Sequence, residues 1–244
     1  MMYATPPAFP ATEVQYNRIL ISALFAGAVA GLIAALLQLV FVQPVLLHAE
    51  LYESGKLVHF GGAAVSAHPV LPGFNPLRDG LSVLFSALVY VGYAMIVVAL
   101  MSLAEQNGHE VTAKKGLLWG LAGFITCQFA PGISLAPEVP GVASADLVQR
   151  QIWWFGTVVA AGVAMWLLAF KEGLAIYATV AALLLAPHLI GAPEPGSFTG
   201  PVPPEIGALF AARAFGVGIA AWVILGTCAA YFWVKEGARQ PIMA

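Results

Sequence analysis

Long apolar stretches alternate with short polar or Pro/Gly-rich stretches along the whole chain. An α-helix needs about 20 apolar residues to cross the roughly 30 Å hydrocarbon core of a bilayer. Six stretches approach or reach this length, and the third and fifth are the shortest. The pattern predicts an all-α, polytopic membrane protein with six transmembrane helices in a single membrane domain over residues 1–244. The predicted spans are 19–42, 81–103, 116–130, 152–170, 174–190 and 207–234.

The segments around the first span complete this organisation. Residues 1–18 precede it, and residues 43–80 are predicted as a long loop after it. The first apolar stretch is longer than the roughly 7–15 apolar residues of a secretory signal, so we expect a retained helix. Small residues such as Gly27, Gly31 and Gly120 recur within the spans. They allow helix backbones to approach closely in lipid.

Composition agrees with an integral membrane protein. Hydrophobic residues make up 60% of the chain and charged residues 9%, and the mean hydropathy is +0.87. A soluble domain carries about 25% charged residues. The net charge of −2 comes without a long basic run, so we expect membrane lipid, and no nucleic acid, as a partner. Cys127 and Cys228 lie far apart in apolar stretches, which is typical of small buried side chains.

The distribution of Lys and Arg predicts the orientation of the helices. Six spans place both termini on one side, and that side carries six of the basic residues outside the spans, against three on the other. Basic residues favour cytoplasmic loops, so both termini, including residues 1–18, are predicted to be cytoplasmic. Four of the five histidines and most carboxylates then belong to the opposite, outer loops.

The first outer candidate is Glu50, in the stretch "QPVLLHAELYE" over 43–53. If helix resumes after Pro44, Glu50 lies at or just beyond the membrane interface. There it is either the solvated polar end of a helix or a carboxylate at the mouth of an ion path. His48 and His68 are weaker candidates in the same loop.

The second outer candidate is the stretch over 135–154. Glu138 lies in a Pro- and Gly-rich turn, Ser144 can cap the following helix, and Asp146 would then lie in its first turn. Asp146 and Arg150 have the spacing and order of a helical ion pair. Trp153 and Trp154 follow, as in the aromatic belt at a membrane interface. A capped and anchored helix start explains most of this stretch, and a site that Arg150 and Glu138 help to orient is the alternative.

Two further stretches place ionisable residues at the outer ends of spans. "PHLIGAPEP" puts His188 at the end of an apolar stretch that Pro193 helps to stop. "PPEIGALFAARAF" begins a helix with Glu205 in its first turn and Arg213 deeper on the same face. An ionisable group within a membrane helix normally faces the bundle and has a partner. For Arg213 the candidates are Glu205, Asp146 and Glu138, unless the side chain extends outward to water.

Imidazole and carboxylate ligands together suit borderline divalent ions such as cobalt, nickel or zinc. No HxxxH or HExxH spacing is present, so such a site must be assembled from different loops. The predicted metal ligands are Glu50, Glu138, Asp146, His188 and Glu205, with His48 and His68 less favoured. The predicted structural or gating residues are Arg150, Trp153, Trp154 and Arg213.

Several of these motifs also resemble a known family. They are "RILISALFAGAVAGLIAALLQLVFVQPVLLHAELYE", "GLLWGLAGFITCQFAPGISLAPEVPG", "ADLVQRQIWW" and "PHLIGAPEP". In their sequences and in their order along the chain, these segments resemble CbtA, the predicted cobalt transporter subunit. The resemblance implies a bacterial inner-membrane protein that takes up Co²⁺ for cobalamin synthesis with a small one-helix partner, CbtB, whose tail carries histidines. Co²⁺ would be the transported ion, and no permanently bound cofactor is implied. The positions carried over are Glu50, Glu138, Asp146, Arg150, Gln151, Trp153, Trp154, His188 and Glu205.

Two other functions are considered beside transport. A non-transporting scaffold or assembly subunit would use the outer Trp and Arg side chains for docking. An intramembrane enzyme would use Asp146, Arg150 and His188, but the sequence has no HExxH and no Gly-x-Ser-x-Gly motif. A P-loop is also absent from the sequence. We therefore expect that the protein is not an enzyme. We expect ion movement to be driven by the membrane potential, by a coupled proton or by a partner.

Overall fold

The computed structural model describes residues 11–62 and 65–239, and every regular element in these ranges is helical. The elements are α1 (Ala11–Leu37), η1 (Gln38–Val42), α2 (Gln43–Glu53), α3 (Pro76–Gln106), η2 (Ala113–Lys115), α4 (Gly116–Phe124), η3 (Ile125–Phe129), α5 (Ala130–Ser134), α6 (Leu147–Phe170), α7 (Leu174–Ile190) and α8 (Pro204–Arg239). Several follow one another without a break, so they form six rods. The predicted all-helical, six-helix membrane fold is confirmed.

Five of the six rods are long and apolar enough to cross a membrane. They are Gln15–Glu53, Pro76–Gln106, Ala113–Ser134, Leu147–Phe170 and Pro204–Arg239, while the sixth, α7, has only 17 residues. Most rods extend beyond the predicted spans. The largest difference concerns the loop predicted at 43–80. Helix continues through Pro44 to Glu53, and α3 begins at Pro76, so the connection covers only residues 54–75.

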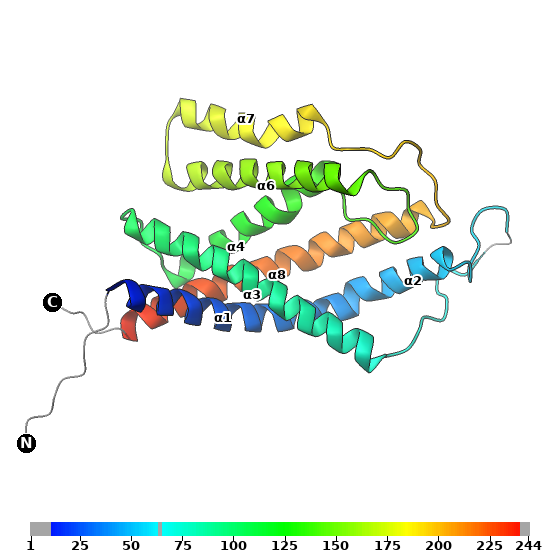
Figure 1. The fold of residues 1–244 in the computed structure, drawn as a ribbon, viewed down its shortest axis with the longest axis horizontal. Helices are drawn as coiled ribbons and strands as arrows, with labels where there is room; N and C mark the ends of the chain where they lie inside the picture. Colours follow the sequence, from blue (N-terminus) through cyan, green and yellow to red (C-terminus); the bar gives the residue numbers. More distant parts are fainter. Residues whose placement is uncertain (1–10, 63–64, 240–244) are drawn as a thin grey trace, which may run out of the picture.

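The rods form a bundle with a pair of helices along one side (Figure 1). Rods α1, α3 and α4 pack on α8, α1 also packs on α3, and α7 packs mainly on α6. The described ends of the chain, at α1 and α8, lie at one end of the bundle. The connections 54–75, 135–146 and 191–203 lie at the other, which we call the loop end. The shared placement of these two described ends agrees with an even number of rods, and the cytoplasmic position of that end stays a prediction.

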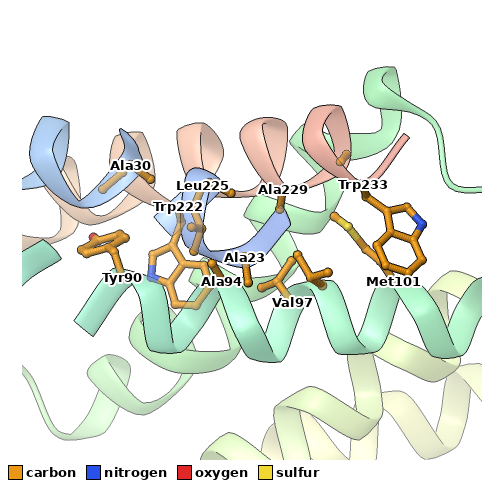
Figure 2. Close-up of a cluster of buried hydrophobic side chains, with 14 of the residues drawn as sticks. Ala23, Ala30, Tyr90, Ala94, Val97, Met101, Trp222, Leu225, Ala229 and Trp233 are labelled. Atoms are coloured by element: carbon orange, nitrogen blue, oxygen red, sulfur yellow. The ribbon is translucent and has the colours of Figure 1, made fainter. Parts of the chain in front are cut away.

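Small side chains let the central helices lie close together. Gly27 and Gly31 of α1 lie against the backbone of α3, and Gly120 of α4 lies against the backbone of α8. Dispersion then acts along the whole contact, which matters in lipid because apolar tails compete equally for apolar side chains. Larger side chains fill the space between α1, α3 and α8, among them the buried Trp222 and Trp233 (Figure 2).

Two membrane rods contain a π-helical turn, and both turns stand at the same spacing before a proline. η1 ends two residues before Pro44, and η3 ends two residues before Pro131. Proline has no backbone N–H, and its ring collides with the carbonyl four residues earlier in a regular α-helix. A wider turn relieves this collision and leaves the rod continuous. Such turns recur at functional sites, and in this chain they position two cavities.

Candidate functional site: two cavities at the π-turns

The first cavity, which we call pocket 1, lies between the η1–α2 region and the start of α3. Its volume is about 200 Å³. Apolar residues of α1, η1 and α2 form much of its wall. Its polar lining is Gln38, Gln43, Glu50, Arg78, Ser82 and Ser86. The Ser86 hydroxyl donates a hydrogen bond to Gln38 Oε1 at 3.1 Å across this space.

A buried carboxylate, Asp79, fixes the wall of pocket 1. It accepts hydrogen bonds from Gln43 Nε2 at 2.7 Å, from Arg78 Nε at 2.7 Å and from the Asn75 backbone N–H at 2.9 Å. These bonds join α2 to the start of α3, so Asp79 serves as a clamp. Asp79 was not among the residues predicted from the sequence. The signal was present in "NPLRDG", because Asn75 is the N-cap of α3 and Asp79 lies in the first turn.

Glu50 is the carboxylate of pocket 1 that is open to solvent. It is exposed and lines the cavity beside Arg78. Within residues 11–62 and 65–239, its carboxylate makes no hydrogen bond or ion pair. Glu50 therefore differs from Asp79, whose two carboxylate oxygens already accept hydrogen bonds.

The second cavity, pocket 2, has a volume of about 240 Å³ and lies beside η3. The turn at 135–138, the first turns of α6 and the first third of α8 complete its wall. Its polar or polarisable lining is Cys127, Gln128, Glu138, Arg150 and Trp154. Arg150 Nη2 forms an ion pair with Glu138 Oε2 at 2.8 Å.

This ion pair corrects the predicted helical pair of Asp146 with Arg150. The helix begins at Leu147, so Asp146 is its N-cap and accepts a hydrogen bond from the Gln149 backbone N–H at 3.0 Å. Ser144 is consequently not the cap. Because the Asp146 carboxylate turns toward the free N–H groups of the first helical turn, Arg150 pairs with Glu138 on the preceding turn.

Arg213 also has a different partner from the predicted carboxylates. Its Nη1 donates to the Phe41 carbonyl oxygen of η1 at 3.0 Å. The next two residues, Ala214 and Phe215, line pocket 2. The first third of α8 therefore contacts one π-turn, η1, and lines the cavity beside the other, η3. The spacing of side chains along the sequence can suggest side-chain partners for Arg213. It could not suggest a backbone carbonyl of a distant segment.

His188 lies outside both cavities. Its Nδ1 is 2.8 Å from Ser134 Oγ, and the neighbouring Pro187 carbonyl accepts a hydrogen bond from Trp153 Nε1 at 3.1 Å. These contacts attach the end of α7 to α5 and α6. Trp153 therefore joins helices, while Trp154 lines pocket 2.

The predicted metal ligands are thus divided among separate places at the loop end. Glu50 lines pocket 1 and Glu138 lines pocket 2. Asp146, Glu205 and His68 are exposed and line neither cavity. His48 is half-buried beside Tyr52, at 5.6 Å between ring centroids. In the part of the chain that the structure describes, no group of three or more His, Cys, Asp or Glu side chains is placed to hold a metal ion.

The chain was compared with known proteins. A family model described as "Probable cobalt transporter subunit (CbtA)" matches residues 16–234, which is most of the chain and includes both cavities. Neither the curated proteins nor the solved structures contain a match.

Proposed function

This chain belongs to the CbtA family of probable cobalt transporter subunits, and we propose that it is the membrane subunit of a divalent cobalt uptake system. The family is one of transporter subunits and not of enzymes. In our proposal the loop end faces the outside of a bacterial inner membrane, as the Lys and Arg distribution predicts. Co²⁺ is the transported ion.

One observation carries the proposal. Each of the two cavities beside a π-turn is lined by one carboxylate, Glu50 of α2 in pocket 1 and Glu138 of the turn after α5 in pocket 2. Single π-turns within α-helices recur at functional sites. An ion that must leave again needs a site of limited affinity, and one or two carboxylates supplemented by water provide such a site.

The other predicted ligands have a capturing role in this proposal. Asp146, His188 and Glu205 belong to the loop end, where exposed carboxylates attract cations to the cavities. The membrane potential then supplies the driving force. A divalent ion that moves inward gains about 4.6 kcal/mol per 100 mV, at about 2.3 kcal/mol for each charge.

A partner is part of the proposed system. The family description calls this protein a subunit, and the resemblance noted above implies a one-helix CbtB-type protein with histidines in its tail. Imidazole from the partner, with the carboxylate of Glu50 in one cavity or of Glu138 in the other, would form an N/O ligand set suited to cobalt.

Uptake of radiolabelled cobalt tests the proposal. Cells would express the wild type, Glu50→Gln, Glu138→Gln or His188→Ala at matched levels, together with the partner. Glu194→Gln is the control, since this exposed carboxylate lies at the same end and lines neither cavity. We expect uptake to fall about tenfold or more in the Glu50 and Glu138 variants, the loss of one charge-assisted contact. Unchanged uptake in both would contradict the proposed site.

A second measurement separates transport from the scaffold alternative. Thermal unfolding of the purified protein would be followed with and without Co²⁺. A ligand that binds the folded state raises the unfolding midpoint, so a cobalt transporter is stabilised and a scaffold is unaffected by the ion.

A further inference from the structure

Arg78 is held in an unusual ion pair at the edge of pocket 1. Its Nε donates to Asp79 Oδ1 at 2.7 Å and its Nη2 to Asp79 Oδ2 at 3.2 Å, so the contact is bidentate. Nη2 also donates to the Gly73 carbonyl oxygen at 3.1 Å. Consecutive side chains of an α-helix do not face each other. The pairing of Arg78 with its own neighbour in the chain therefore needs an explanation.

Glu50 is a partner that Arg78 leaves unused. Both side chains line pocket 1, and the charge of Glu50 acts on the Arg78 guanidinium across this space. Glu50 is exposed, and none of the ion pairs within residues 11–62 and 65–239 involves its carboxylate. Arginine and carboxylate side chains form strong, charge-assisted hydrogen bonds where they meet. The bonds of Arg78 to Asp79 therefore keep its guanidinium away from Glu50.

Asp79 is built into the fold as a fixed partner. Its side chain is only 5% exposed, against 33% for Arg78. Gln43 Nε2 in α2 donates to Oδ1 of the same carboxylate, and the backbone N–H of Asn75, the N-cap of α3, donates to Oδ2. Rotation of the carboxylate would leave these buried donors unpaired, which is unfavourable. Asp79 therefore holds the guanidinium in one place, while the Glu50 carboxylate remains free.

We infer that Asp79 is a positioning residue that sequesters the Arg78 guanidinium, so that Glu50 remains an unpaired carboxylate for a divalent cation in pocket 1. The charges of Arg78 and Asp79 cancel, and the charge of Glu50 is left to attract the cation. Pairing of Arg78 with Glu50 would cancel that charge and leave the buried Asp79 without a counter-ion, which is strongly unfavourable. This inference rests on the proposed function, and it identifies the residue that sets the charge of the proposed site.

Thermal unfolding of the full-length protein in lipid nanodiscs tests the exchange of partners without cobalt. Glu50→Gln should leave the wild-type midpoint unchanged, because Glu50 forms no ion pair there. In an Asp79→Asn background the released guanidinium pairs with Glu50. The same Glu50→Gln substitution should then lower the midpoint by about 2–4 °C, the effect of one such pair in a chain of this length. An equal effect of Glu50→Gln in both backgrounds would overturn the inference.

Glu53→Gln is the matched control for this cycle. Glu53 lies one turn further along α2, is exposed and lines neither cavity. Its substitution should leave the midpoint unchanged in both backgrounds. A decrease confined to the Asp79→Asn background but equal for Glu50→Gln and Glu53→Gln would show a general effect of acidic charge on α2, and it would also overturn the inference.

The kinetics of cobalt uptake test the consequence for the site. Asp79→Asn should raise the Co²⁺ concentration for half-maximal uptake about tenfold or more and change the maximal rate little, because the charge that binds the ion is cancelled. The double variant Arg78→Gln/Asp79→Asn should restore most of the affinity, since no guanidinium remains to pair with Glu50. A purely structural clamp predicts a double variant impaired at least as much as Asp79→Asn, and that result would overturn the inference. The double variant leaves no unpaired charge, so it decides the question even where Asp79→Asn alone does not fold.

The two measurements separate this inference from the proposed function. The unfolding cycle needs neither cobalt nor the partner protein. An exchange of partners beside cobalt uptake that is insensitive to Glu50→Gln would refute the role of Glu50 in transport and leave the sequestration of Arg78 intact. Uptake that depends on Glu50, beside no exchange of partners in Asp79→Asn, would support the transport proposal and overturn the inference.

Discussion

Substitution of Gly120 by alanine tests the close contact between α4 and α8. The added Cβ would lie 2.8 Å from Val223 Cα and 2.9 Å from the Trp222 carbonyl carbon, and it would collide with the Trp222 carbonyl oxygen. Ordinary van der Waals contact begins at 3.4 Å, so the approach to Val223 is about 0.6 Å too short. All three atoms belong to the backbone, and no side chain can rotate away.

The helices must therefore separate. A radial gap of about 0.5–1 Å forfeits roughly a quarter to a half of the dispersion energy between facing atoms. Overpacking of this kind costs about 1–3 kcal/mol. For a soluble domain of this length, a loss of about 2 kcal/mol lowers the unfolding midpoint by roughly 4–8 °C. We expect a decrease of that order for Gly120→Ala in detergent, measured by size-exclusion chromatography of heated samples with fluorescence detection.

Gly92→Ala is the matched control, because a Cβ at Gly92 in α3 meets no atom within 4 Å. Only the helix propensity of alanine changes there, a gain of up to about 1 kcal/mol. The control should therefore unfold at the wild-type temperature or slightly above it. An equal midpoint for both variants would refute the argument that small residues hold α4 and α8 together.

Two further predictions use contacts at different depths of the bundle. Gly218→Ala should push the flexible Gln128 side chain, which lines pocket 2, out of place, so cobalt uptake should fall several-fold while the unfolding midpoint stays near that of the wild type. A lowered midpoint together with unchanged cobalt uptake would show that Gly218 only packs. Arg18 is only 16% exposed, and it bonds to Glu105 at 2.8 Å and to a backbone carbonyl of α8 at 3.0 Å. Arg18→Met should cost about 1–3 kcal/mol, whereas Arg239→Met, at a side chain 62% exposed, should cost almost nothing. Similar urea or heat stability of the two variants would contradict this.

The outline of the fold could be predicted from the sequence because the membrane imposes it. Each rod must be apolar over the thickness of the bilayer, and every backbone polar group must be satisfied within a helix. This rule located the six rods and placed both termini together. It could not foresee helix through Pro44, because proline normally ends a helix and only the wider turn at η1 accommodates its ring.

The periodicity of the side chains did not predict which face of each helix is buried. In water, a polar face marks the surface of a helix and an apolar face marks the core. In lipid both faces are apolar, so the exposed Phe85 and the buried Tyr90 of α3 are equally compatible with the pattern. The sequence indicated that Gly120 allows a close approach, and the structure identified the backbone of α8 as its neighbour.

The candidate site could also be predicted only in part from the sequence. The sequence by itself determined which residues carry chemistry and that they gather at one end, because successive spans alternate in direction and every second connection emerges at the same end. Only the tertiary structure decided their partners. It separated Glu50 from Glu138, paired Glu138 with Arg150 and placed Gln128 in the same cavity. These contacts join segments that are distant along the chain, and their geometry depends on how the rods pack and on how two π-turns redirect them, which no local spacing specifies.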